Sequence, residues 1–346
     1  MRIGAGVMAL FILLAVLLGS LFVYSARAAS WAEKTWPPGG DFIELDGEFS
    51  GMRLHYVLQG ESRPGVAPVV LIHGASGNLR DLTESLGEPL ARETLAVAFD
   101  RPGHGWSGRG THPRIADPAV QARAIRQAAA KLGMEKPVVL GHSWGASVAA
   151  AWALQDGEGL SGLVPLSGAL YPWPGGVAWY HSVVRTPLIG SIFIRTLIVP
   201  GGKALMKKGV AANFHPDRAP DGYAEAIALP LLFRPSEFRA NSEDTANLKP
   251  HLARQSADYE KIRVPTIVVT GNADYTVSPK LHSYAFHNAV AGSELVKLKG
   301  TGHMPHHARR EAVVDAVLRL ARGERPRAGQ TTIHSDGRVE MPEAAD

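Results

Sequence analysis

Gly141-His142-Ser143-Trp144-Gly145 has the pattern Gly-x-Ser-x-Gly. It follows the short apolar run Pro137–Leu140, which predicts a buried strand, and it opens the alanine-rich stretch Gly145–Leu154, which predicts a helix. A sharp turn from a strand into a helix strains its central residue and exposes that side chain at the carboxyl edge of a sheet. The sequence therefore predicts Ser143 as a nucleophile, with the N–H of Trp144 directed to where an oxyanion would form.

Further short apolar runs lie on both sides of this turn. Runs of this length suit strands that are buried on both faces of a sheet, and helix-like stretches such as Pro118–Leu132 lie between them. This alternation predicts an α/β fold with a mostly parallel central sheet flanked by helices. The predicted strands are Arg53–Leu58, Pro68–Ile72, Thr94–Phe99, Pro137–Leu140, Gly162–Leu166, Pro265–Thr270 and Glu294–Leu298.

The alternation of strands and helices is interrupted between residues 169 and 262. This segment shows no convincing strand, and we expect it to be a helical cap inserted between two sheet strands. The core of the fold is then predicted in residues 41–168 and 263–322. Residues 29–40, which contain Pro37-Pro38-Gly39-Gly40, are expected to form a linker. The polar tail, residues 323–346, is predicted to be disordered.

The chain begins with an apolar segment that predicts membrane targeting. Residues 3–26 carry no charged side chain. As a helix they would be about 36 Å long, against about 30 Å for the hydrocarbon core of a bilayer. Ala26-Arg27-Ala28 has the small-x-small form of a signal-peptidase site, but the apolar run is longer than a secretory core. We expect residues 1–28 to be a retained single-pass anchor with the soluble domain exported. The alternative is secretion after cleavage.

A serine hydroxyl needs a base to remove its proton and an acid to orient that base. Asp274 follows the predicted strand Pro265–Thr270, and His303 follows the predicted strand Glu294–Leu298. The carboxyl ends of parallel strands meet at one edge of a sheet, so the loops that hold these residues can converge. We therefore predict a catalytic triad of Ser143, Asp274 and His303. This order along the chain differs from that of chymotrypsin and of subtilisin.

With these residues the chain resembles the α/β-hydrolases over about residues 42–320. His73-Gly74, after a predicted strand, also fits that family. The resemblance implies that the N–H of Ala75 is the second oxyanion donor, beside that of Trp144. It also implies that Asp100 and Arg101 have structural roles.

The residue at the nucleophile position narrows the expected chemistry. Related epoxide hydrolases and haloalkane dehalogenases use an aspartate there, so Ser143 favours acyl chemistry. The segment around it resembles that of serine esterases, C–C bond hydrolases and aminopeptidase-like members. Its sequence does not distinguish among these three activities. We expect a serine hydrolase that cleaves a small to medium apolar carboxylic ester through an acyl-enzyme. The alternatives are a C–C bond or amide hydrolase with the same triad, or a non-catalytic membrane-tethered binding protein.

Several other functions are disfavoured by composition and motifs. The net charge of +4 is too small to suggest a nucleic-acid binder, and the absence of cysteine excludes thiolate chemistry and cysteine-ligated metals. We predict no cofactor, since no nucleotide-binding motif is present. His303, His306 and His307 have spacings that could mimic a metal site, but Met304-Pro305 disfavours a continuous helix there, so no metal is predicted. His306 and His307 are expected at the surface or as local supports.

The predicted cap is rich in aromatic residues. These side chains either line an apolar pocket or pack the cap on the core, and the ring of Trp144 could border that pocket. The cap aromatics considered are Trp173, Trp179, Tyr180, Phe193, Phe214, Tyr223, Phe233 and Phe238.

Overall fold

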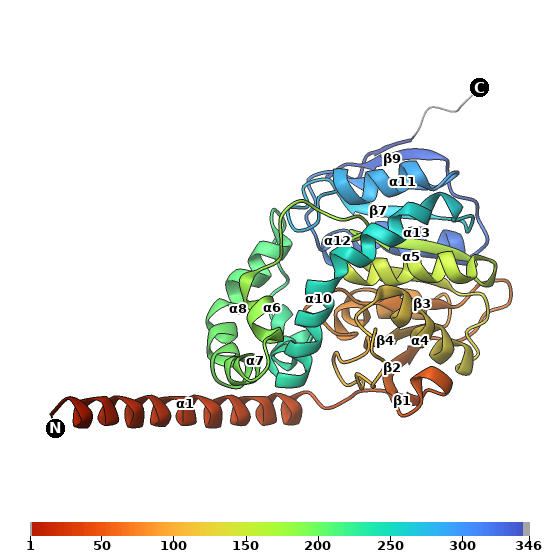
Figure 1. Ribbon diagram of the computed structural model, residues 1–346. Helices are drawn as coiled ribbons and strands as arrows, with labels where there is room; N and C mark the ends of the chain where they lie inside the picture. The colour runs from red at the N-terminus through yellow and green to blue at the C-terminus, as the bar shows by residue number, and fades with distance from the viewer. Residues whose placement is uncertain (1, 342–346) are drawn as a thin grey trace.

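The structure is a computed structural model that describes residues 2–341, with side chains described for residues 6–341. A central sheet carries helices on both faces, a separate group of helices stands beside it, and a long N-terminal helix projects from the body (Figure 1). This architecture confirms the predicted α/β fold with a mostly parallel sheet. The strands are β1 (Asp41–Glu44), β2 (Arg53–Gln59), β3 (Val69–Ile72), β4 (Ala96–Phe99), β5 (Val138–His142), β6 (Gly162–Leu166), β7 (Ile267–Gly271), β8 (Glu294–Leu298), β9 (Gly329–Ile333) and β10 (Val339–Glu340).

The order of the strands creates a crevice at the middle of the sheet. In the described part of the chain the order is β1-β2-β4-β3-β5-β6-β7-β8-β9-β10. Strands β3 to β9 run parallel to one another, whereas β1 pairs antiparallel with β2, β2 with β4, and β10 with β9. The chain passes from β3 outward to β4 and then returns to β5 on the other side of β3. Ligands of open α/β sheets bind at such a reversal, beyond the carboxyl ends of the two strands.

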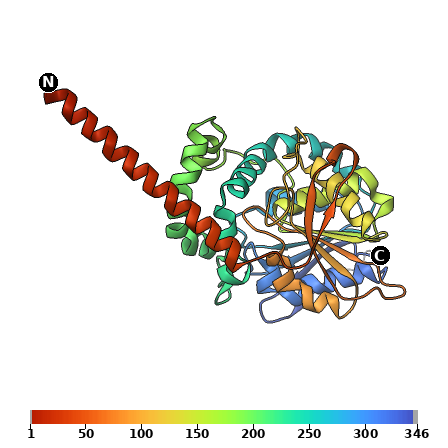
Figure 2. The same cartoon turned by 90° about the horizontal axis from the view of Figure 1, so that it is seen from below.

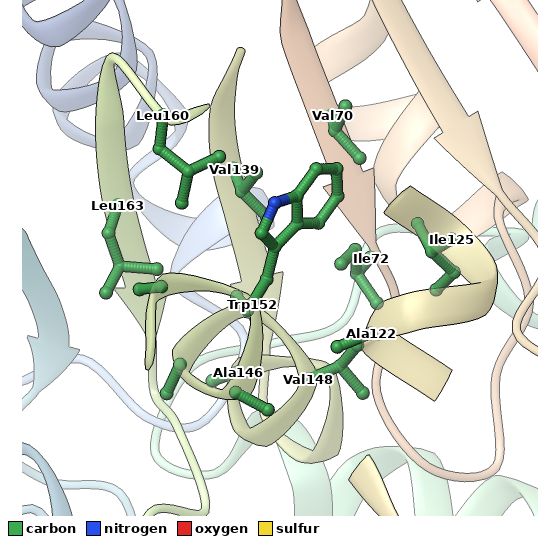
Figure 3. Packing of buried hydrophobic residues seen from close by; sticks show 14 of the residues in the cluster. Val70, Ile72, Ala122, Ile125, Val139, Ala146, Val148, Trp152, Leu160 and Leu163 are labelled. Carbon is green, nitrogen blue, oxygen red and sulfur yellow. The ribbon is translucent and has the colours of Figure 1, made fainter. Parts of the chain in front are cut away.

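Two apolar clusters hold the helices against opposite faces of the sheet. Successive residues of β3 alternate between them: Val70 and Ile72 face one cluster, and Val69 and Leu71 face the other. Both faces of the strand are therefore buried, which explains why its sequence is apolar throughout. Figure 3 shows the first cluster, in which Trp152 lies among residues of strands and helices.

The helices divide between the sheet and the cap. Helices α4 and α5 pack together on one face, and α13 contacts strands from the other. Residues 167–265, all of them described, contain only helices, turns and loops. The helices are α1 (Arg2–Thr35), α2 (Arg80–Leu82), α3 (Glu88–Ala91), α4 (Pro118–Lys131), α5 (Trp144–Asp156), α6 (Trp179–Arg185), α7 (Ile189–Phe193), α8 (Val199–Phe214), α9 (Tyr223–Ala226), α10 (Pro235–Gln255), α11 (Ala285–Ala289), α12 (Pro305–Ala308) and α13 (Arg310–Ala321). Short 3₁₀ or π turns lie at Gly47–Phe49, Thr83–Gly87, Gly157–Gly159, Ile194–Ile198, Leu229–Phe233, Ser256–Lys261 and Lys280–Tyr284.

The expected linker at residues 29–40 is wrong for its first half. Helix α1 continues to Thr35 and ends just before Pro37-Pro38. Ala32 is buried against Ala228 and Leu231 of the cap, so packing stabilises the helix beyond the apolar run. The long helix is one of two segments in the described chain that are long and apolar enough to cross a membrane; the other is Ile189–Phe214.

The prediction of a disordered tail is also wrong for most of its length. Strand β9 pairs in parallel with β8 from Gly329↔Glu294 to Ile333↔Leu298, and β10 pairs with β9. Backbone hydrogen bonds to an exposed sheet edge order these polar residues without an apolar run. Residues 342–346 lie outside the described part.

Two buried histidines hold the backbone next to strand ends. Nε2 of His73 accepts a hydrogen bond from the N–H of Arg101 at 3.0 Å. Nδ1 of His282 accepts from the N–H groups of Leu170 and Tyr171, at 3.2 and 3.0 Å. Burial lowers the pKa of His73 to about 3 and that of His282 to about 4. Both side chains are therefore neutral in the folded chain at neutral pH.

The first prediction concerns Trp152, which is 3% exposed. Trp152→Ala removes a large side chain from the packing between α5 and the sheet, and we expect a loss of about 3–5 kcal/mol in the free energy of unfolding. Chemical denaturation followed by circular dichroism measures this loss. Trp179→Ala is the control, because Trp179 is 68% exposed and its removal should cost far less. Equal effects of the two substitutions would contradict the packing described here.

The second prediction follows from the neutral histidines. In the unfolded chain a histidine titrates near pKa 6.5, so between pH 7 and pH 5 the unfolded state takes up protons that folded His73 and His282 do not. Stability is therefore fully present above pH 6.5 and falls as the pH drops. Most carboxylates are still ionised in this range. The Tm, measured at pH 7, 6 and 5, should fall at each step, and a constant Tm would rule out buried neutral histidines.

Candidate active site

Ser143 lies in a strained turn at the carboxyl end of β5, where α5 begins. Its φ of 53° and ψ of −116° are rare for a residue with a side chain. The turn requires a glycine nearby, because a Cβ on Gly145 would overlap the carbonyl oxygens of Ile72 and His73. The close approach of α5 to β3 therefore fixes where the Ser143 hydroxyl stands.

Of the three residues predicted as a triad, His303 lies within hydrogen-bond distance of both Ser143 and Asp274. Nε2 of His303 is 3.1 Å from Oγ of Ser143, and Nδ1 of His303 is 2.7 Å from Oδ2 of Asp274. The carboxylate can only accept, so Nδ1–H donates to Asp274 and Nε2 is left to accept the serine proton. Oδ1 of Asp274 accepts from the N–H groups of Thr276 and Val277, both at 2.8 Å, which orients the carboxylate.

Two amide groups flank the serine, as the predicted oxyanion hole requires. Ala75 follows β3 and Trp144 follows Ser143, so both lie at the reversal of strand order. Within residues 6–341 neither N–H has a hydrogen-bond acceptor. Gly74 permits the approach of the two loops, since a Cβ there would lie 3.0 Å from Cβ of Ser143. The ring of Trp144 does not border the cavity. It is buried under the guanidinium of Arg101, 4.1 Å from the ring centre.

Buried polar residues hold the Ala75 loop in place. Arg101 donates to the carbonyl oxygens of His73 and Gly74, at 3.1 and 3.2 Å, and pairs with Asp244 of α10 at 2.7 Å. From the cap, Oδ1 of Asn241 accepts from the N–H of Ser76 at 2.7 Å.

The neighbouring aspartate, Asp100, orders the loops beside the site. It accepts from the N–H groups of Leu79 and Trp106, both at 2.8 Å, and from the ring of His55 at 2.7 Å. Arg101 and Asp100 thus have structural roles, with no contact to Ser143. Sequence analysis missed Asn241 and Asp244, because no motif marks these positions on a cap helix.

A second cluster that the sequence did not predict lies beside the triad. Asp81 accepts from Nε2 of His306 at 3.0 Å, from Nε2 of His307 at 2.9 Å and from the Tyr223 hydroxyl at 2.9 Å. Burial alone would raise the pKa of Asp81, but His306 and His307 outweigh it and hold that pKa well below its usual value. Both histidines are thus local supports rather than surface residues.

This cluster also holds donor atoms of the kind that bind metals. Donor atoms of Asp81, His142 and His306 lie within 4.8 Å of one another in the described structure. Both oxygens of Asp81 already accept histidine N–H groups, and Nε2 of His142 donates to the carbonyl oxygen of His303 at 3.0 Å. Burial, followed by the charges of His306 and His303, holds the pKa of His142 well below its usual value. The arrangement is that of a hydrogen-bonded support behind His303.

A cavity of about 970 Å³ opens above Ser143 and His303, between the core and the cap. Most of its lining is apolar. Of the cap aromatics considered from sequence, the lining includes Trp179, Tyr180, Phe193, Tyr223, Phe233 and Phe238. Trp173 and Phe214 do not line it; Trp173 packs on the core cluster and Phe214 against Tyr223 and His307.

Comparisons with known proteins place this chain among hydrolases. An uncharacterized protein of Mycobacterium bovis is 28% identical over 268 residues, which cover 73% of this chain and 74% of that protein. A proline iminopeptidase of Clostridioides difficile is 27% identical over 107 residues, 31% of this chain and 36% of the relative. The chain thus spans only about a third of that curated relative.

Solved structures share the architecture at low sequence identity. The enol-lactonase of Burkholderia xenovorans superposes with a TM-score of 0.63 at 19% identity, over 81% of this chain and 99% of that one. A family model described as the alpha/beta hydrolase family matches residues 69–316, which is more than half of the chain. The chain therefore belongs to the alpha/beta hydrolase family, and it is a hydrolase.

Proposed function

We propose that this protein is a membrane-tethered serine hydrolase that cleaves small to medium apolar carboxylic esters. The observation that carries this proposal is the 3.1 Å contact between Oγ of Ser143 and Nε2 of His303, at the base of an apolar cavity. A serine, an oriented imidazole and two free amides are the groups that acyl transfer needs.

In the proposed mechanism Ser143 attacks the ester carbonyl carbon while His303 accepts the hydroxyl proton. Asp274 holds the imidazole in the tautomer that can accept and stabilises its charged form. The N–H groups of Ala75 and Trp144 stabilise the oxyanion, each worth about 3 kcal/mol by analogy with other oxyanion donors. His303 then returns the proton to the departing alcohol, and a water molecule repeats the sequence to release the acid.

The lining of the cavity favours an uncharged substrate. Asp81 is the one charged side chain among the described lining residues, and its oxygens accept from His306, His307 and Tyr223. The remaining lining is mostly aliphatic and aromatic, which stabilises an apolar acyl group by removing it from water.

An amide hydrolase with the same triad is the second candidate, since three of the similar relatives bear the name proline iminopeptidase. A peptide substrate with a charged amino end calls for an unpaired carboxylate in the cavity. Asp81 does not offer one, because its carboxylate already accepts hydrogen bonds from His306, His307 and Tyr223. The lining of the cavity therefore favours an ester over a peptide amide.

The packing of α1 supports a retained anchor rather than a cleaved signal. Cleavage after Ala28 would cut inside a continuous helix, where Ala28 packs against an apolar cluster of the cap. Four residues further on, Ala32 is 1% exposed. Removal of the preceding turns would also uncover Ser25, which is buried in the same helix.

The third prediction concerns the nucleophile. Ser143→Ala should lower the turnover of p-nitrophenyl acyl esters by at least about 10³-fold, because the acyl-enzyme cannot form. A fluorophosphonate probe should label the parent chain once and leave this variant unlabelled. Ser161→Ala, outside the site, is the matched control and should keep both activity and labelling. Undiminished turnover in Ser143→Ala would overturn the proposal, and labelling of the parent chain would exclude a non-catalytic binding protein.

The choice of histidine has its own test. His303→Ala should be nearly as damaging as Ser143→Ala, since no other described imidazole contacts Oγ of Ser143. His307→Ala should retain most turnover, because His307 contacts Asp81 and not the serine. If His307→Ala abolished turnover and His303→Ala did not, His303 would not be the catalytic base.

The fourth prediction concerns the N-terminus. The mature protein, isolated from a membrane fraction, should have the mass of a chain that still contains residues 3–26. Its solubilisation should require detergent and not high salt. A mature N-terminus at Ala29 would show that the segment is a cleaved signal.

A further inference from the structure

Helix α1 is covered by the cap over part of its apolar run. Residues 6–17 are exposed, whereas Leu18, Leu21, Ser25, Ala28 and Ala32 are partly or fully buried. These positions recur every three or four residues and so form one face of the helix. The face packs against the turn Ile194–Ile198 and against α8. Figures 1 and 2 both show the later part of α1 running alongside the cap, while its N-terminal part projects away from the body.

The apolar part of α1 that precedes Leu18 is too short to cross a bilayer alone. Residues 3–17, as a helix, measure about 22 Å, whereas the hydrocarbon core is about 30 Å thick. The next turns, which begin at Leu18, must complete the span. The cap packs against these same turns. A spanning α1 therefore brings the adjoining surface of the cap to the level of the lipid.

That cap surface has the composition of a membrane-binding surface. Outside α1, six of the ten exposed large apolar side chains fall within residues 179–205, Leu188 and Ile192 among them. Residues 179–208 contain five Lys or Arg and no Asp or Glu. Apolar side chains among cations are typical of segments that lie at the surface of anionic lipid. Tyr24 and Trp31 of α1, with Lys203 at 5.4 and 5.6 Å from their rings, mark the aromatic belt expected there.

The cavity above Ser143 extends to this same surface. Leu21 of α1 lines it, together with Leu197 and Leu205 of the cap, both of which are exposed. The cavity therefore joins the nucleophile to the side of the anchor helix, at the depth where that helix meets lipid.

We propose that the cap docks on the bilayer through residues 179–208, and that the substrate is a long-chain acyl ester that enters the cavity from the lipid beside Leu21. This inference rests on the proposed serine hydrolase function, and it extends the substrates from the small to medium apolar esters named there to esters of long acyl chains. The acyl chain leaves the lipid along an apolar wall, so its burial from water is maintained throughout entry. The ester bond to Ser143 Oγ forms as the carbon–oxygen bond to the alcohol breaks. Water then releases the fatty acid, and the proton passes through His303.

The first experiment measures docking without reference to activity. The chain contains no cysteine, so a single introduced thiol can be labelled selectively. Full-length Ile192→Cys, labelled with an environment-sensitive fluorophore, is reconstituted in vesicles of phosphatidylcholine and phosphatidylglycerol that contain a spin-labelled lipid. We expect strong quenching at position 192. Leu58→Cys is the matched control and should be quenched little. Leu58 is also exposed, but it pairs with Val97 near the start of β4, toward the amino ends of the parallel strands and away from the edge that carries Ser143. Equal quenching at the two positions would overturn docking.

The second experiment measures substrate entry. Leu188→Glu/Ile189→Glu places two charges on the docking surface, and neither residue lines the cavity. Turnover of monooleoylglycerol embedded in these vesicles should fall about tenfold or more, because charges are costly in the apolar zone. Turnover of water-soluble p-nitrophenyl butyrate should stay within about twofold. Leu58→Glu should leave both rates unchanged.

The outcomes separate this inference from the proposed function. If Ser143→Ala retains both activities, the serine hydrolase itself is wrong. If both activities depend on Ser143 but Leu188→Glu/Ile189→Glu leaves vesicle turnover at the parent rate, the function stands and entry from lipid is overturned. A chain that dimerises through the cap face in vesicles, with vesicle turnover unaffected by the charges, would assign that face to a second copy and would also overturn docking.

Discussion

The close approach of α5 to β3 is the constraint on which the site depends. Without a side chain at Gly145, the helix can begin against the carbonyl oxygens of Ile72 and His73. This contact forces Ser143 into its left-handed turn and brings the loop after β3 alongside it. The positions of the predicted nucleophile and of the two amides proposed for the oxyanion hole therefore depend on one backbone contact at the centre of the sheet. The loops that carry Asp274 and His303 then need only to reach the same edge.

Sequence patterns predicted the parts of the fold that local composition determines. The seven expected strands are all present. Five of them, β3 to β7, are short runs buried on both faces of the sheet, whereas β2 is partly exposed and β8 contains Glu294 and Lys297. Strand β9 was missed because Gly329–Ile333 is polar and is ordered by pairing with the edge of β8. The end of α1 was misplaced for a related reason, since Ala32 gains its stability from Leu231, far away in the chain.

The residues of the candidate site also fall into two groups, those that the sequence predicted and those that it did not. Ser143, Asp274 and His303 each follow a strand, and strand direction alone was enough to predict that they meet. The residues that hold them in place are bound by contacts between distant segments, as Asp81 is to His306 and Asn241 is to Ser76. A single sequence carries no trace of such pairs, because each partner is an ordinary polar residue in its own local context.

The buried pair of Arg101 and Asp244 has a consequence for how new specificities could arise on this scaffold. One member belongs to the catalytic core and the other to a cap helix, and both side chains are fully shielded from water. Loss of the Asp244 carboxylate would leave the buried charge of Arg101 without its acidic partner in a medium of low polarity, at a cost of about 3–5 kcal/mol. A cap taken from a relative, by recombination or by protein engineering, must therefore also carry an acidic residue at the position of Asp244.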